Sequence, residues 1–178
     1  MKIVTGHSIW IIPTGSIKRK LSKLMIELSK KFNAPKFSIP HVTLYENLHG
    51  NQSTLILKTK ELAKSIKPFK LKLTQIDKGK NFRNLVILVK KTKELMNAYS
   101  KAKKIFGVKP KRNEYIPHLT LLLKDISQSE REEIIKNIGR NFDLEFEVKS
   151  IYLVPIGKNP LKWIPIKRFC LKKPITSH

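Results

Sequence analysis

The spacing of apolar residues alternates along the chain between the periods of helices and strands, and the resulting order of elements occurs twice. Apolar residues three and four positions apart predict an amphipathic helix, whereas alternation or a short apolar run predicts a strand. The first half is predicted to contain strand 8–12, helix 16–32, strand 37–45, helix 53–66 and strand 69–76. The second half is predicted to contain strand 85–89, helix 92–106, strand 115–123, helix 127–138 and strands 144–154 and 163–171.

The duplicated order predicts an α+β fold in which residues 1–178 form a single bilobal domain, with lobe-forming halves at about 1–77 and 78–178. Each lobe is expected to hold an antiparallel-type sheet with flanking helices, because crossover helices pack as one layer on a sheet. Two such lobes would enclose a central cleft, which is the natural place for a site. Helix starts are expected at Ser16, Thr92 and Ser127, where polar side chains can cap backbone N–H groups.

A six-residue motif occurs at matching places of this repeat. It reads Ile-Pro-His-Val-Thr-Leu around His41 and Ile-Pro-His-Leu-Thr-Leu around His118, 77 residues later. Because a strand alternates its side chains between two faces, His41 and Thr43 share one face, and His118 and Thr120 repeat the arrangement. The two motifs are therefore expected to face each other across the cleft.

Two imidazoles that face each other suit acid–base chemistry on a cyclic phosphate. Opening such a phosphate needs a base for water, an acid for the departing sugar oxygen, and donors for the non-bridging oxygens. Histidine has an ordinary pKa of about 6.5, so one ring can be neutral while the other is charged near neutral pH. The hydroxyls of Thr43 and Thr120 can serve as the donors. This scheme requires neither a metal ion nor a cofactor.

Simpler explanations of the histidines compete with this one. A single histidine beside a threonine is most often an ordinary half-buried side chain, but two copies in matching contexts favour a shared catalytic site. A stable metal site usually needs three or four protein ligands, and no carboxylate or thiol stands at ligand spacing from the pair. His7, His49 and His178 lack the repeated context and are not expected to be catalytic.

The formal charge of the chain is +24, and 31 of its 37 basic residues are lysines. Residues 1–124 hold 27 Lys and Arg against 6 Asp and Glu, whereas residues 125–147 hold 7 of the 13 acids. A basic surface attracts polyanions, which favours a phosphate-bearing partner such as RNA. Arginine is better suited to bidentate phosphate binding, however, and a lysine excess is equally typical of a solvated surface or of adaptation to heat. Both interpretations stay open.

The sequence also bears on the compartment of the protein. Its longest apolar runs are far too short to span a bilayer, and its start lacks a long apolar segment followed by a small-residue cleavage site. The single Cys170 excludes an internal disulfide, which fits a reducing compartment. We therefore expect a cytoplasmic protein that does not bind a membrane, and we expect a monomer.

The paired His-x-Thr strands resemble the signature of the 2H phosphoesterase superfamily, and the chain is most similar to its eukaryotic-type cyclic phosphodiesterases. Trp10, in the segment Ser-Ile-Trp-Ile-Ile-Pro, resembles the Trp-bearing opening strand of that family, and Trp163 also has a counterpart. The resemblance covers nearly the whole chain. It implies a bilobal α+β fold and metal-independent cleavage of a cyclic phosphate. It also implies that the two motif histidines form the acid/base pair and that the two motif threonines bind the phosphate.

The resemblance further implies that Trp10 and Tyr115 line the substrate cleft, although core packing is an equally good interpretation of Trp10. The plant members of the family carry a tyrosine at the position of Leu123, so one aromatic wall of the cleft is missing here. Tyr45, which would share the face of Thr43 in a regular strand, is the expected replacement. Phe82 is expected to belong to the core.

Substrates of the family include 2′,3′-cyclic nucleotides and ADP-ribose 1″,2″-cyclic phosphate, and we expect the chain to hydrolyse such a substrate to a phosphomonoester. The Trp10 segment favours this small substrate. An alternative is an RNA 2′,3′-cyclic phosphodiesterase or 2′-5′ RNA ligase that acts on RNA ends, which the basic charge of residues 1–124 favours. A second alternative is a basic RNA-binding module without catalysis, but such a module has no need of two intact motifs.

Overall fold

The computed structural model describes residues 4–37, 39–107 and 114–172. Its strands, in chain order, are β1 (Val4–Ile11), β2 (Val42–Leu48), β3 (Phe69–Ile76), β4 (Leu85–Val89), β5 (His118–Leu122), β6 (Asn141–Val148), β7 (Ser150–Gly157) and β8 (Lys167–Cys170). Its helices are α1 (Gly15–Lys31), α2 (Gln52–Ser65), α3 (Lys93–Phe106), α4 (Gln128–Ile138) and the short 3-10 helix η1 (Pro160–Lys162).

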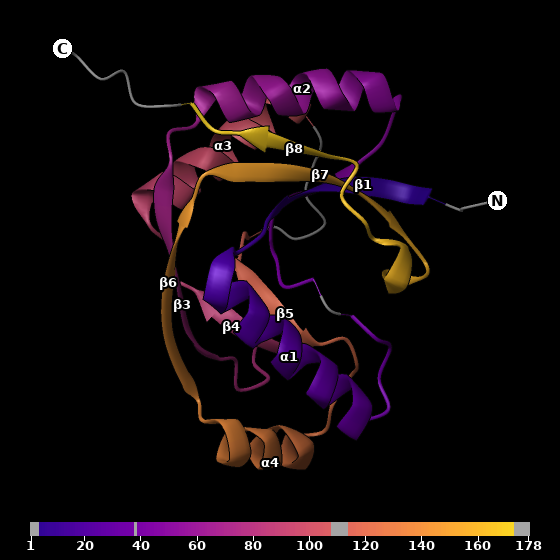
Figure 1. Ribbon diagram of the computed structural model, residues 1–178, viewed down its shortest axis with the longest axis vertical. Helices are drawn as coiled ribbons and strands as arrows, with labels where there is room; N and C mark the ends of the chain where they lie inside the picture. Colours follow the sequence, from indigo (N-terminus) through magenta and orange to yellow (C-terminus); the bar gives the residue numbers. More distant parts are fainter. Residues whose placement is uncertain (1–3, 38, 108–113, 173–178) are drawn as a thin grey trace.

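The eight strands form one antiparallel sheet in the order β6-β3-β4-β5-β2-β1-β7-β8. The sheet is strongly curled (Figure 1) and has two four-stranded halves, β6-β3-β4-β5 and β2-β1-β7-β8. The two halves meet where Val42 of β2 pairs with Leu119 of β5. The predicted α+β class is confirmed, and the two expected sheets are hydrogen-bonded into one.

Each half of the sheet takes strands from both halves of the sequence. β3, from the first half of the sequence, pairs with β4 and β6. In return β7, from the second half, pairs with β1 and β8. The expected boundary near residue 77 therefore falls between two strands, β3 and β4, that hydrogen bond to each other.

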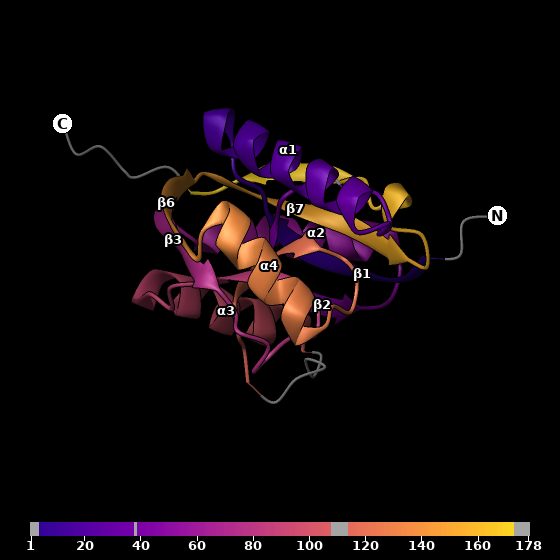
Figure 2. The same cartoon turned by 90° about the horizontal axis from the view of Figure 1, so that it is seen from below.

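The helices repeat this exchange. α1 packs against β5, and α3 packs against β2, so each of these helices covers a strand of the other half of the sequence. Figure 2 shows α1 and α3 on opposite sides of the strands, whereas Figure 1 shows α2 and α4 at opposite ends of the molecule. Within the part of the chain that the structure describes, no helix is both long and apolar enough to cross a membrane.

The helix caps agree with the predictions in two of three cases. Thr92 caps α3, and Ser127 and Glu130 form the capping box of α4. The expectation for α1 is wrong, because Thr14 holds the N-cap position, without a side-chain hydrogen bond, and Ser16 lies inside the first turn.

The strands around the two motifs are shorter than predicted. β2 begins after His41 and β5 begins at His118, because Pro40 and Pro117 have no N–H group to donate to a ladder. Ser38, within the first of these predicted strands, lies outside the described residues.

The strands predicted at the end of the chain are also altered. The segment predicted as strand 144–154 contains the end of β6 and the start of β7, with Lys149 between them. β8 is shorter than predicted because Trp163 directly follows η1 and lies outside the strand.

Candidate active site

The two motif histidines are oriented by the motif itself. Nδ1 of His41 lies 3.0 Å from the carbonyl oxygen of Ile39, and Nδ1 of His118 lies 2.8 Å from the carbonyl oxygen of Ile116. A carbonyl oxygen can only accept a hydrogen bond, so each Nδ1 carries a proton and donates it. The proline between the two residues removes one backbone donor and favours an extended residue before it. In both rings Nε2 is therefore the nitrogen that remains available for proton transfer.

The register of β2 and β5 places the two motifs side by side. Val42 pairs with Leu119 where the sheet halves join. Extending this antiparallel register by one residue in each direction brings Thr43 next to His118 and Thr120 next to His41. Residues opposite each other on antiparallel strands share a face, with Cβ atoms about 4.5–5.5 Å apart. Two imidazoles and two hydroxyls thus alternate around one point of the sheet.

An aromatic wall covers His41, which is only 9% exposed. Its ring stacks on Trp10 with a centroid distance of 3.3 Å and an interplanar angle of 5°. Phe37 meets the same ring edge-on at 5.3 Å, and Trp163 contacts both Trp10 and Phe37. Trp10 is itself 1% exposed, so it meets the site through the ring of His41.

Burial sets the protonation of His41. Loss of solvent lowers the pKa of this imidazole to about 3, the Ile39 carbonyl opposes the shift, and the positive charge of His118 adds to it. His41 is therefore a neutral imidazole near neutral pH, with an unprotonated Nε2.

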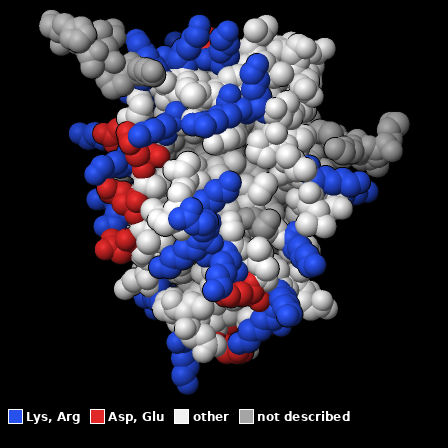
Figure 3. Space-filling view, in the orientation of Figure 1, with Lys and Arg blue, Asp and Glu red and all other residues white. Residues whose placement is uncertain are grey.

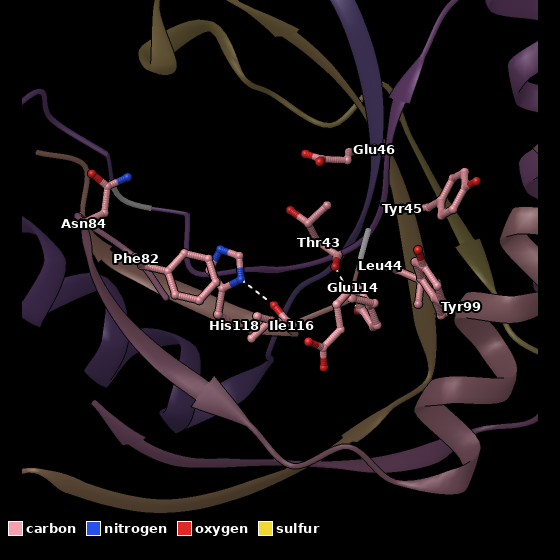
Figure 4. Close-up of a pocket in the computed structure, with 11 residues that line it drawn as sticks. Thr43, Leu44, Tyr45, Glu46, Phe82, Asn84, Tyr99, Glu114, Ile116 and His118 are labelled. Atoms are coloured by element: carbon pink, nitrogen blue, oxygen red, sulfur yellow. Dashed lines mark hydrogen bonds between the residues drawn. The ribbon is translucent and has the colours of Figure 1, made fainter. Parts of the chain in front are cut away.

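His118 is only half-buried and borders a pocket. The ring of Phe82 covers part of it, at a centroid distance of 4.1 Å and an interplanar angle of 41°. The pocket has a volume of about 300 Å³, which is at the lower end of the range for small-molecule sites. Figure 4 shows its lining, which consists of Thr43, Leu44, Tyr45, Glu46, Phe82, Asn84, Tyr99, Glu114, Tyr115, Ile116 and His118.

The loop that carries Phe82 is fixed by two buried charged residues, Asp77 and Arg131. The Asp77 carboxylate accepts hydrogen bonds from the backbone N–H groups of Gly79, Asn81 and Phe82. The Arg131 guanidinium, from α4, donates to four carbonyl oxygens, those of Asp77, Phe82, Arg83 and Asn84. Gly79 has a φ of 86°, which strains other residues, and a Cβ there would lie 3.2 Å from Nε of Arg131.

A bulge in β2 changes which side chains face the site. Thr43 pairs with Trp10 of β1, but Tyr45 pairs with the adjacent residue Ile9, so β2 has one extra residue. Adjacent residues of β1 point to opposite faces, and Tyr45 therefore faces away from Thr43. The expectation that the two share a face is wrong for this reason. Glu46 joins Thr43 at the pocket instead.

Tyr45 packs into the core on α3. It is 1% exposed and contacts the rings of Tyr99 and Phe106 at centroid distances of 5.6 and 6.1 Å. In Figure 4 its ring points away from Thr43 and Glu46.

Tyr115 connects the two motifs. Its hydroxyl donates to the carbonyl oxygen of Thr43 at 3.0 Å, and its ring stacks on Tyr99 with a centroid distance of 4.1 Å. Burial raises the pKa of the Tyr115 hydroxyl well above its usual range, so this donor stays protonated. The hydrogen bond therefore fixes the second motif against the backbone of the first.

Comparison with known families agrees with this geometry. A sequence profile of the family described as cyclic phosphodiesterase-like protein matches residues 5–152. The chain belongs to this family. The expected place in the 2H phosphoesterase superfamily and the expectation of a cyclic phosphodiesterase-type enzyme are thereby confirmed.

Individual relatives extend the likeness. A cyclic phosphodiesterase of Arabidopsis thaliana is 25% identical over 127 residues, which cover 71% of this chain and 69% of the relative. The crystal structure of TT0787 of Thermus thermophilus has a TM-score of 0.69 at 16% identity, and covers 95% of this chain and 99% of its own. E. coli LigT complexed with phosphate has a TM-score of 0.63 at 15% identity, and covers 94% and 97%. These two structures share the fold of the present protein.

Some residues of this cyclic phosphodiesterase-like protein could not be found from the motif. Phe82 is 7% exposed, as expected of a core residue, but it also lies against His118. Tyr99, Asn84 and Glu46 at the pocket are not predicted by the motif at all. A second aromatic ring beside a motif histidine, matching Trp10 beside His41, is the signal that could have pointed to Phe82. Among the described residues no three His, Cys, Asp or Glu side chains are grouped to hold a metal ion.

Proposed function

We propose that this protein hydrolyses a 2′,3′-cyclic nucleotide or ADP-ribose 1″,2″-cyclic phosphate to a phosphomonoester by acid–base catalysis with His41 and His118. The observation that carries the proposal is the shared orientation of the two rings. Both donate Nδ1–H to a backbone carbonyl, which assigns proton transfer to Nε2, and each ring lies beside a threonine on the same face of the sheet.

The reaction needs one proton taken and one proton given. Nε2 of one histidine removes a proton from water as the water oxygen attacks phosphorus. The bond from phosphorus to one ribose oxygen breaks, and that oxygen takes a proton from Nε2–H of the other histidine. The hydroxyls of Thr43 and Thr120 donate to the non-bridging oxygens as negative charge grows there. No metal ion takes part in this scheme.

The surroundings of the two rings suggest their roles. Burial keeps His41 neutral, so we assign it as the base, and the bound phosphate anion would offset the effect of burial when His41 takes up its proton. His118, which borders the open pocket, is then the acid that protonates the ribose oxygen. Tyr115 contributes to substrate binding from the pocket side, Trp10 supports the ring of His41, and the buried Tyr45 packs behind the pocket.

The family membership favours an enzyme over the non-catalytic RNA-binding module. E. coli LigT, which shares the fold, has been crystallised with phosphate, 3′-AMP, ATP and NADP+, so this fold accommodates nucleotide-type ligands. A nucleotide carrying a cyclic phosphate is therefore the ligand class that we propose here.

A turnover assay in the presence of a chelator tests the proposal. The substrates are a 2′,3′-cyclic nucleotide, ADP-ribose 1″,2″-cyclic phosphate and an RNA that ends in a 2′,3′-cyclic phosphate. We expect a phosphomonoester product whose rate of formation does not respond to the chelator. Activity that is lost with the chelator and restored by a metal ion would contradict the mechanism.

A second candidate function is action on RNA ends, as an RNA 2′,3′-cyclic phosphodiesterase or 2′-5′ RNA ligase. Figure 3 shows Lys and Arg side chains over the face where α1, α2 and β8 lie, with Asp and Glu gathered along the edge near β6. In α1 six basic residues accompany one acid. A positive face of this kind attracts a polyanion, and it predicts an RNA affinity that falls steeply with salt.

A cytoplasmic location and a monomeric state complete the proposal.

A further inference from the structure

The pocket beside His118 differs in charge from the rest of the molecule. The chain has 37 basic and 13 acidic residues, yet two carboxylates and no lysine or arginine line this pocket among the described residues. One of them, Glu114, lies at the rim and is paired with Lys91 at 2.6 Å. The other, Glu46, is half-buried and comes from β2 directly beyond the bulge. Figure 4 shows its carboxylate extending from β2 on the side of Thr43 and His118.

The same pocket offers aromatic side chains for stacking, which the residues next to His41 do not. Trp10 is 1% exposed and is covered by His41, and Leu123 has no ring to offer. Tyr99 and Tyr115 are half-buried, stack on each other and line the pocket. Glu46 is near this wall, since its negative charge helps to raise the pKa of the Tyr99 hydroxyl, after the larger effect of burial. A flat ring that enters the pocket therefore meets tyrosines on one side and a carboxylate at its edge.

A carboxylate accepts hydrogen bonds through two oxygens and donates none. It repels a further phosphate and favours a neutral group that presents adjacent N–H donors. Among the nucleobases, guanine offers two neighbouring donors, the ring N1–H and the exocyclic N2–H. Adenine and cytosine pair their amino group with an acceptor nitrogen, and uracil has one N–H between two carbonyl groups. Guanine is thus the base whose edge matches Glu46.

We propose that this pocket is the nucleobase subsite of the enzyme and that Glu46 selects guanine by accepting hydrogen bonds from N1–H and N2–H. The inference rests on the proposed function, because the cyclic phosphate must lie between the two histidines for the attached base to reach the pocket. The volume of about 300 Å³ leaves room for one base and part of its ribose. Asn84, on the opposite side of the pocket in Figure 4, can donate to the guanine carbonyl through its side-chain amide.

The test compares 2′,3′-cyclic GMP with 2′,3′-cyclic IMP, which lacks only the N2 amino group. We expect kcat/KM of the wild-type protein to be about tenfold or more higher for cyclic GMP, since a bidentate base contact discriminates on that scale. Glu46→Gln is expected to remove most of this preference by raising KM for cyclic GMP, with a smaller change for cyclic IMP. Glu114→Gln makes the same change of charge in the same pocket and is expected to keep the preference, because Glu114 is engaged by Lys91.

Equal kcat/KM for the two substrates in the wild-type protein, or an equal loss for both in Glu46→Gln, would overturn the inference and leave the proposed function standing. If neither a 2′,3′-cyclic nucleotide nor ADP-ribose 1″,2″-cyclic phosphate is hydrolysed, the proposed function fails, and binding decides the inference by itself. Titration calorimetry with guanosine 2′-monophosphate and inosine 2′-monophosphate is then expected to show the same preference, and to show its loss in Glu46→Gln. Equal affinities would refute the subsite.

Discussion

His41 and His118 share one motif and one hydrogen-bonding pattern, yet they lie in different surroundings. His41 is 9% exposed and stacks face to face on Trp10, with Phe37 at its edge. His118 is half-buried, meets a tilted Phe82 and opens onto a pocket. The backbone thus gives both rings the same tautomer, while the side chains around them exclude water from His41 more completely than from His118. Duplication of a motif does not make its two copies interchangeable.

The largest expected effect comes from removing either ring. His41→Ala and His118→Ala are each expected to lower kcat/KM for a 2′,3′-cyclic nucleotide by about 10²- to 10⁴-fold, because acid and base act in one step. The double variant is expected to lose little more than either single variant. His49→Ala is the matched control, since His49 is exposed and outside the site. Wild-type rates in either motif variant would exclude the two-histidine mechanism.

The two threonines are expected to matter less. Thr43→Val and Thr120→Val keep the shape of the side chain but remove the hydroxyl, and we expect kcat to fall by about ten- to a thousandfold, as for the loss of one oxyanion donor. Because the cleft is more open at Thr43, which lines the pocket, comparison of the two variants shows whether the two sides contribute equally. An unchanged kcat in both would remove the threonines from catalysis.

The support of His118 can be weakened from a distance. Arg131 does not touch the ring, but its four hydrogen bonds hold the loop that carries Phe82. Arg131→Met leaves these buried carbonyl groups without a donor, so we expect the free energy of unfolding to drop by about 2–4 kcal/mol. We also expect about a tenfold lower kcat at a temperature where the variant is folded, since misplaced catalytic groups reduce rates on this scale or more.

The pH dependence of kcat separates this positioning role from a purely structural one. A change in the surroundings of His118 is expected to move the alkaline limb of the profile in Arg131→Met, whereas simple loss of folded protein would scale all rates equally. Arg131→Lys keeps the charge but not the forked geometry, and it is expected to recover part of the stability. A wild-type profile in Arg131→Met would reject the positioning role.

Acid is expected to lower the stability of the protein through His41 without any change of sequence. His41 takes up a proton near pH 6.5 in the unfolded chain but only near pH 3 in the folded one. Between these pH values the unfolded state binds more protons than the folded state. The contribution of neutral His41 to the free energy of unfolding is therefore complete above pH 6.5 and is lost as the pH falls toward 3. One such group gives a slope of at most about 1.4 kcal/mol per pH unit.

Urea unfolding between pH 7 and pH 4 measures this slope. His41→Gln is expected to flatten it, because glutamine takes up no proton in this pH range. An equal slope in wild type and His41→Gln would show that burial does not suppress protonation of His41.

Local sequence patterns were sufficient for most of the fold and for bringing together the side chains at the centre of the candidate site. The periodicity predicted the helices and the strands, since burial of one face fixes the period of apolar residues. The repeated Ile-Pro-His-x-Thr motif predicted the two histidines and two threonines proposed for catalysis and phosphate binding. In each motif, strand alternation places the histidine and the threonine on one face. These inferences depend only on residues close together in the sequence.

The parts that were missed depend on pairing between distant strands. Strand alternation places Tyr45 on the face of Thr43 only if β2 pairs with β1 without interruption. The extra residue in β2 turns Tyr45 to the opposite face and brings Glu46 to the pocket instead. Phe82 reaches His118 because Arg131, 49 residues further along the chain, anchors its loop. A bulge and a long-range anchor leave little mark on local periodicity.

The exchange of strands between the two halves of the sheet also bears on how the chain folds. Ser8 of β1 pairs with Val154 of β7, so one edge of β1 stays unpaired until nearly the last strand is made, although β2 can pair with the other edge earlier. Such non-local pairing slows folding, because the entropy lost in closing a long loop precedes the contacts that compensate for it. During synthesis the sheet half β6-β3-β4-β5 can assemble as soon as β6 has emerged from the ribosome. The half that carries His41 is completed only afterwards, and the candidate active site is therefore one of the last parts of the molecule to form.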